Sequence, residues 1–200
     1  MATVEIAFDE GTGWGEQLDQ EISDWTKVLE ADPGDASAYV NRGVVYGNRG
    51  QHDQALSDFN KALEIDPADA SAYVNRGVAY WNKGQHDQAI SDCTRALEID
   101  PEDASAYYNR GLAYGEKGQW WQAISDYTKA LEAEPENAAA WHKKGDALRK
   151  AGKHYDAIKA YEGFIKFALP ESAEEAKEIE RVVKDLKNRI KGKYEEVAHC

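Results

Sequence analysis

The stretch 70–103, ASAYVNRGVAYWNKGQHDQAISDCTRALEIDPED, recurs along this chain with few changes. Four prolines mark the period of the recurrence, because they stand 34 residues apart: Pro33, Pro67, Pro101 and Pro135. The units run over 36–69, 70–103, 104–137 and, with more divergence, 138–171. A repeat of this length predicts an array of stacked units rather than one compact globule.

Each unit has the pattern of two helices joined by a turn. In the first unit, Tyr39, Gly43 and Tyr46 fall at helical spacing, the run Asn-Arg-Gly over 48–50 interrupts it, and Phe59 belongs to a second periodic run. One such hairpin cannot bury its apolar stripe alone. The sequence therefore predicts an all-α solenoid in which neighbouring hairpins share a continuous core.

The repeat resembles the tetratricopeptide repeat (TPR) family, whose signature combines an aromatic residue, a glycine, a tyrosine, an alanine, a second aromatic and a closing proline. The resemblance covers about two thirds of the chain and implies a right-handed α-solenoid with a concave groove for peptides or partner helices. Arginine or lysine replaces the leucine of the signature before each glycine. The matching glycines are Gly43, Gly77, Gly111 and Gly145, and the alanines that open the second helices are Ala55, Ala89, Ala123 and Ala157.

Both ends of the array carry segments with their own pattern. Residues 16–32 align with a second repeat helix and are expected to form an N-terminal capping helix. Residues 172–194 begin with a capping box, Ser172 with Glu175, and predict an amphipathic C-terminal capping helix that covers the last repeat. Residues 1–15 are expected to form a flexible arm; Val4, Ile6 and Phe8 alternate like a strand, so the alternatives are disorder and occupation of the groove by the arm.

Composition limits the classes of function. The chain has a net charge of −13, with 10 basic and 26 acidic residues over 1–141 and 14 basic and 11 acidic residues over 142–200. This field disfavours nucleic acid as a partner, and no apolar run is long enough for a membrane span. The acidic start is unlike a secretory signal, which predicts a cytoplasmic protein. The charge asymmetry is compatible with weak head-to-tail homo-oligomers or with ordinary solubilising surface charge.

The expected binding surface is an apolar stripe on the first helix of each hairpin. Positions six before, three before, one after and four after each repeat glycine share a face that differs from the face of Tyr39 and Tyr46. Trp81 breaks the repeat where other units carry glycine, and is the predicted anchor. Trp121, which replaces an aspartate, is expected on a second, convex or edge surface. The candidate partner-binding residues are Val40, Asn41, Val44, Val74, Asn75, Val78, Trp81, Tyr108, Asn109, Leu112 and His142.

A recurring asparagine, Asn41, Asn75 and Asn109, could contact a peptide backbone or bond the neighbouring repeat. TPR domains that bind the acidic C-termini of chaperones use a clamp of lysine, arginine and asparagine. The corresponding positions here are Val40, Val44, Asn75, Ser105 and Asn109, which lack the cations. The predicted partner is therefore an apolar protein or peptide segment with basic flanks, and not an acidic chaperone tail.

Other recurring polar residues have structural interpretations. Arg42, Arg76 and Arg110 recur with Asp58, Asp92 and Asp126, which predicts an internal ion-pair ladder. The aspartates Asp35, Asp69 and Asp103 are expected to cap helices rather than bind calcium. Cys93 takes the place of a core aromatic and is expected to be a small buried hydrophobe. The histidines His52, His86 and His154 lie on different hairpins, so no metal site is expected.

No phosphate loop or nucleophile motif is present, so we expect no catalytic residues, no cofactor and no enzyme activity. The main hypothesis is a non-catalytic protein–protein interaction scaffold that holds a peptide or partner helix in the concave groove. The alternative is a self-assembling structural protein that forms homo-oligomers through its caps and edges.

Overall fold

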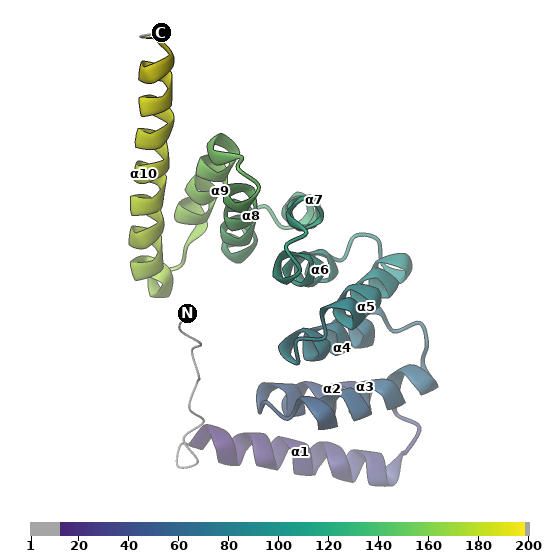
Figure 1. Ribbon diagram of the computed structural model, residues 1–200. Helices are drawn as coiled ribbons and strands as arrows, with labels where there is room; N and C mark the ends of the chain where they lie inside the picture. The colour runs from purple at the N-terminus through teal and green to yellow at the C-terminus, as the bar shows by residue number, and fades with distance from the viewer. Residues whose placement is uncertain (1–12, 199–200) are drawn as a thin grey trace.

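The computed structural model of the protein gives the backbone of residues 13–198, with side chains described as far as residue 192 (Figure 1). This part of the chain is all-α, as predicted, and its helices follow one another along an open arc. The elements are α1 (Gly13–Ala31), α2 (Ala36–Asn48), α3 (His52–Ile65), α4 (Ala70–Asn82), α5 (His86–Ile99), α6 (Ala104–Glu116), α7 (Trp120–Ala133), α8 (Ala138–Lys150), α9 (His154–Phe167), the 3-10 turn η1 (Pro170–Ser172) and α10 (Ala173–Ala198).

Capping side chains and glycine turns set the limits of the hairpin helices. Asp35, Asp69 and Asp103 accept a hydrogen bond from the backbone N–H three residues on, at 2.9 to 3.0 Å, so the predicted N-caps are confirmed. The turn inside each hairpin contains a glycine with a φ between 68 and 76°, the left-handed region that other residues avoid. These glycines are Gly50, Gly84, Gly118 and Gly152.

A second set of glycines lets the two helices of a hairpin approach closely. A Cβ atom at Gly43 would lie 2.6 Å from the ring of Phe59, which is buried. In the second hairpin the equivalent ring is replaced by Cys93, whose Sγ would lie 3.0 Å from a Cβ at Gly77. Cys93 is fully buried, as expected, and forms no disulfide. The repeat glycine is therefore required by the side chain packed against it.

The predicted ion-pair ladder is confirmed in the first three hairpins. The guanidinium of Arg76 donates two hydrogen bonds to the Asp92 carboxylate, both at 2.7 Å, and a third to Oδ1 of Asn60 in the preceding repeat. Arg42 and Arg110 make the same bidentate contacts with Asp58 and Asp126. Arg42 also donates to Thr26 on α1, and Arg110 to Thr94 on α5, so each arginine joins the two helices of its own hairpin to the helix that precedes the hairpin.

The curvature of the array follows from which helices touch. The first helices of successive hairpins contact one another in the order α2, α4, α6, α8, whereas the second helices, α3, α5, α7 and α9, show no such contacts in the described chain. The first helices are therefore closer together and line the inner side of the arc. Figure 1 shows α4 and α6 on this inner side and α5 and α7 on the outer side.

Helices α1 and α10 cover the two ends of the array. The buried side chains of α10, Ile179, Val183 and Leu186, join a core cluster with Phe164 and other residues of the fourth hairpin, as the amphipathic pattern predicts. Helix α1 begins at Gly13, so Gly13 and Gly15 are helical rather than part of an arm, and the strand-like residues 4–8 lie outside the described chain.

The start of α10 also differs from the prediction. The Glu175 carboxylate lies 2.9 Å from Nδ1 of His142 instead of closing a capping box with Ser172. Ser172 belongs to the turn η1, and its backbone N–H donates to the Leu169 carbonyl at 2.9 Å. The carboxylate is therefore engaged with the fourth hairpin, which ties α10 to α8.

Candidate functional site: a pocket on the concave face

A pocket of about 520 Å³ opens on the inner side of the arc between the second, third and fourth hairpins. We call it the concave pocket. Trp81 lies near the C-terminal end of α4, Tyr108 and Leu112 lie one turn apart on α6, and α8 closes the far side. The lining residues are Trp81, Tyr108, Leu112, Gly115, Glu116, Trp120, Tyr127, Lys143, Asp146, Ala147, Arg149 and Lys150. Three residues predicted from sequence therefore come together here.

Aromatic packing fixes the floor of the concave pocket. The rings of Tyr108 and Tyr127 are 5.9 Å apart between centroids and are tilted by 51°. Burial raises the pKa of both phenols above their ordinary value, so both are neutral hydroxyls at physiological pH. Nε1 of Trp81 is buried and has no hydrogen-bond partner among the described residues. Packing, rather than a hydrogen bond, therefore holds this indole in place.

A glycine provides the space beside Tyr127. Gly115 occupies the position in the third repeat that Trp81 occupies in the second. A Cβ atom added there would approach only the Tyr127 hydroxyl, at 3.7 Å, which is an ordinary contact. At the same position of the repeat, the Trp81 side chain forms one wall of the concave pocket, whereas Gly115 has no side chain and leaves the pocket open.

The charged rim of the concave pocket comes from α6 and α8. The Asp146 carboxylate accepts a hydrogen bond of 2.8 Å from the Tyr161 hydroxyl, and Nε of Arg149 donates to the same hydroxyl at 3.1 Å. Lys143 and Lys150 are exposed. With Glu116, the rim holds three cations and two carboxylates. The charge of the rim is therefore nearly balanced. The prediction that a partner carries basic flanks is based on the acidity of the whole array, and the rim of the pocket does not share that acidity.

Other predicted stripe residues contribute to the core rather than to an open surface. Val40 and Val74 are each only 8% exposed and belong to core clusters. Val44 packs against the same core as Val40, and Val78 is half-buried. The accessible apolar surface is therefore shorter than predicted and is concentrated around Trp81, Tyr108 and Leu112.

Two of the three recurring asparagines donate hydrogen bonds within their own helices. Nδ2 of Asn109 donates to the Ser105 carbonyl at 2.9 Å, and Nδ2 of Asn75 donates to Oγ of Ser71 at 3.3 Å. Asn41 is exposed. Neither Asn75 nor Asn109 forms a hydrogen bond with the neighbouring repeat in the described part of the chain.

His142 lies apart from the concave pocket. It lines a second pocket of about 410 Å³ with Phe164, Phe167 and Glu175, at the junction of α8, α9 and α10. Its ring lies 5.0 Å from that of Phe164, and Nδ1 faces the Glu175 carboxylate. This histidine therefore connects the last hairpin to the C-terminal cap and is not placed with Trp81.

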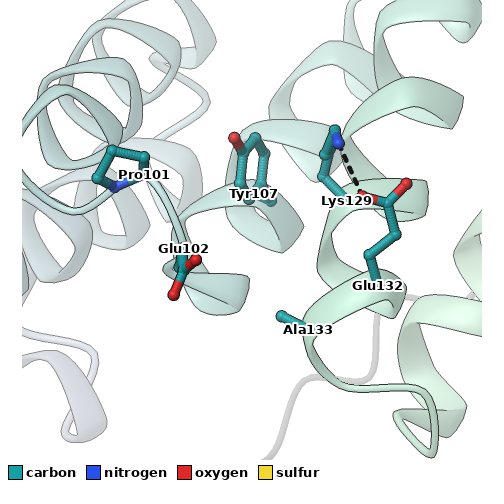
Figure 2. A pocket seen from close by; sticks show the side chains of 6 residues that line it. All are labelled: Pro101, Glu102, Tyr107, Lys129, Glu132 and Ala133. Atoms are coloured by element: carbon teal, nitrogen blue, oxygen red, sulfur yellow. Dashed lines mark hydrogen bonds and ion pairs between the residues drawn. The ribbon is translucent and has the colours of Figure 1, made fainter.

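A larger hollow, of about 620 Å³, lies elsewhere, at the turn before the third hairpin (Figure 2). Tyr107 and Pro101 line one side of it, and Lys129 and Glu132 line the other. Nζ of Lys129 and the Glu132 carboxylate form an ion pair of 2.7 Å. Ala133 lines it where the first two repeats carry Ile65 and Ile99, so a smaller side chain opens the notch. Its walls lack a cluster of aromatic residues, which makes the concave pocket the better candidate for binding.

Within the part of the chain that the structure describes, no group of three or more histidine, cysteine or carboxylate side chains is arranged to hold a metal ion. None of the helices described is long and apolar enough to cross a membrane.

Comparison with known proteins identifies the repeat. A tetratricopeptide repeat profile matches residues 70–103 and 104–137, a TPR repeat profile matches 48–84, and a further tetratricopeptide repeat profile matches 25–57 and 126–159. Together these matches span 25–159. The chain belongs to the tetratricopeptide repeat family. A comparison of the TPR chain with curated proteins gives no significant match.

Solved TPR structures share the fold. MamA is 27% identical, with a TM-score of 0.70 over 82% of this chain and 93% of its own. The first TPR of Spaghetti (RPAP3), bound to the HSP90 peptide SRMEEVD, is 27% identical, with a TM-score of 0.58 over 58% of this chain and 93% of its own. The Arabidopsis OM64 TPR domain is 28% identical, with a TM-score of 0.56 over 57% and 94% of the two chains.

Several residues of the concave pocket could not be identified from the sequence. Tyr127 matches the repeat pattern as a core aromatic, and it is a buried residue whose hydroxyl lies beside Gly115 in the lining of the pocket. Lys143 and Lys150 come from the next hairpin, and their contribution depends on how that hairpin is rotated. In the sequence, only their position in the divergent fourth repeat distinguishes these two lysines from ordinary surface residues.

Proposed function

We propose that this protein is a non-catalytic protein-interaction scaffold whose concave pocket binds an apolar segment of a partner protein. The observation that carries the proposal is the convergence of Trp81, Tyr108 and Leu112 on one open pocket in a TPR array. Large aromatic side chains in a concave site often dominate binding energy. The RPAP3 domain, which has the same fold, is a TPR bound to a peptide from another protein.

The bound segment is expected to be extended or helical and to place an apolar side chain between Trp81 and Leu112. An acidic chaperone tail is not the expected ligand, because Val40, Val44 and Ser105 occupy the positions at which the clamp carries cations or a polar amide. Asn75 and Asn109 remain available as acceptors, since only their N–H groups have partners within their own helix.

The test is capture of a partner from an extract of the source cells, followed by titration of the identified segment. We expect Trp81→Ala with Tyr108→Ala to abolish specific capture. The single change Trp81→Ala should weaken binding by about 2 kcal/mol, roughly thirty-fold in Kd. Retained capture by the double variant, with its helical signal unchanged, would place the interaction outside the concave pocket.

A matched pair of glycine variants gives a sharper test. Gly115→Leu should fill the concave pocket and block binding, while Gly47→Leu, at the equivalent position of the first hairpin, should have no effect. Both sites accept a Cβ without a close contact, so both variants should fold. Solution mass, measured over a range of concentrations, separates a monomeric receptor from the alternative of a self-assembling scaffold.

A further inference from the structure

One position of the repeat holds an acidic residue in the first two hairpins and an aromatic residue in the last two. The second residue of each hairpin's second helix is Asp53 in α3 and Asp87 in α5, but Trp121 in α7 and Tyr155 in α9. The side chains of Trp121 and Tyr155 are 58% and 65% exposed, and neither belongs to a core cluster. The core therefore does not explain these two large aromatic residues.

The aspartates at this position have a structural role that the aromatics cannot fulfil. Asp53 forms an ion pair with Lys83, and Asp87 forms one with Lys117, so each pair joins one hairpin to the next. At the third junction the lysine is replaced by Ala151 and the aspartate by Trp121. The ionic contact between neighbouring hairpins is absent at this junction, and an exposed apolar surface stands in its place.

Two lysines lie over the new aromatic rings. Nζ of Lys153 is 5.6 Å from the centroid of Trp121, and Nζ of Lys159 is 4.6 Å from that of Tyr155. Lys153 directly precedes α9 and Tyr155 lies in the first turn of that helix, so the two cation–ring pairs lie near each other. Both lysines also depart from the repeat, in which the earlier units carry glutamine and serine.

The local charge changes at the same place. The segments 47–57, 81–91 and 115–125 each contain one basic and one acidic residue, so each has a net charge of zero. The equivalent segment 149–159 contains Arg149, Lys150, Lys153 and Lys159 against Asp156, which gives +3. Lys153 and Lys159 lie beside the two exposed rings, whereas Arg149 and Lys150 line the concave pocket. A net positive segment stands out in a chain whose total charge is −13.

We infer that Trp121, Lys153, Tyr155 and Lys159 form a second interaction surface, here called the edge surface, for an acidic protein segment that carries large apolar side chains. Carboxylates of such a segment would pair with the ammonium groups, and its apolar side chains would cover the exposed rings. The edge surface is distinct from the concave pocket, which is lined by Trp120 and not by Trp121.

The repeat itself supplies the variant that removes the edge surface. Trp121→Asp with Ala151→Lys rebuilds the ion pair of the two preceding junctions and should fold at least as well as the wild type. Lys153→Glu with Lys159→Glu reverses the charge while keeping both rings, and changes only exposed side chains. Trp14→Ala is the control for loss of an exposed tryptophan elsewhere, since Trp14 is 75% exposed on α1.

Fluorescence anisotropy with three labelled octapeptides tests the inference. The first has Leu-Phe between acidic triplets, the second has Leu-Phe between lysine triplets, and the third has Gly-Ser between acidic triplets. We expect the wild type to bind the first at least tenfold more tightly than either of the others. Both double variants should weaken that binding at least tenfold, while Trp14→Ala and Gly115→Leu should leave it unchanged.

Three results would overturn the inference: no measurable binding of the first peptide, a preference for the lysine-flanked peptide, or equal binding by the wild type and the two double variants. Self-association that Trp121→Asp with Ala151→Lys abolishes, without peptide binding, would assign the edge surface to a second copy of the chain and reject a separate acidic partner. Because the Gly115→Leu control blocks only the concave pocket, failure here is distinguishable from failure of the proposed function.

Discussion

At the scale of single residues, Cys93 shows how one substitution changes the response of the fold to pH. Burial raises the pKa of this thiol from its ordinary value of 9.0 to about 12. Between these values the thiol would ionise in the unfolded chain and stay neutral in the folded one. The buried neutral thiol therefore makes its full contribution to the free energy of unfolding below pH 9, and this contribution is lost as the pH rises toward 12.

We predict that the stability advantage of the wild type over Cys93→Ala narrows by up to about 1.4 kcal/mol per pH unit above pH 9. Urea denaturation of both proteins, in reducing buffer at a series of pH values, measures the difference. The two proteins differ only at residue 93, so the effects of all other groups cancel in the comparison. A difference in unfolding free energy that stays constant from pH 8 to pH 11 would contradict the prediction.

At the scale of helices and hairpins, the ion-pair ladder binds three elements at once. Arg76 lies on α4, its carboxylate partner Asp92 on α5 and its amide partner Asn60 on α3. The hydrogen-bonded carboxylate raises the pKa of Arg76, and Asp92 is buried. Removing one partner would leave the other charge in a site with little access to water.

Asp92→Ala should therefore lower the free energy of unfolding by about 3 kcal/mol. The double variant Arg76→Leu with Asp92→Ala should lose much less, because both charges are removed together. The fourth hairpin lacks this ion pair, since it carries Ala160 at the position of Asp92 and Lys144 at the position of Arg76. Denaturation monitored by circular dichroism measures the free energy of unfolding of the wild type, the single variant and the double variant. A double variant that is less stable than the single variant would refute the prediction.

The elements also show how far the sequence predicts the structure. A period of 34 residues predicts the hairpins, their caps and the ladder, because each recurs with the same local partners. The binding surface depends on the angle between successive hairpins, which no local pattern specifies. Val40 and Val74 share the face of Trp81 by helical spacing, but the neighbouring hairpin covers them, whereas Trp81 borders a glycine and stays accessible.

At the scale of the whole molecule, the array depends on its C-terminal cap. Helix α10 supplies Ile179, Val183 and Leu186 to the core of the fourth hairpin. Burying each of these side chains stabilises the fold by roughly 1.5–3 kcal/mol. Without α10, the facing surface of α9 would be exposed to water.

A chain that ends at Ser172 should lose about 4 kcal/mol or more of stability and show an early melting step of the fourth hairpin. A chain that ends at Gly192 retains the buried residues of α10 and is the control. Thermal melts followed by circular dichroism, with binding of an apolar dye, compare the two. An unchanged melting temperature in the shorter chain would show that α10 does not stabilise the array.

The arc in Figure 1 is assembled from contacts between neighbouring hairpins, so its length is not set by any long-range closure. The junction of residues 69 and 70 and that of residues 103 and 104 have the same capping geometry. A gene in which 70–103 is duplicated in frame would thus create only interfaces of a kind that already exist. Unequal recombination could lengthen or shorten this scaffold by whole units, giving selection a way to change its reach without redesigning its core.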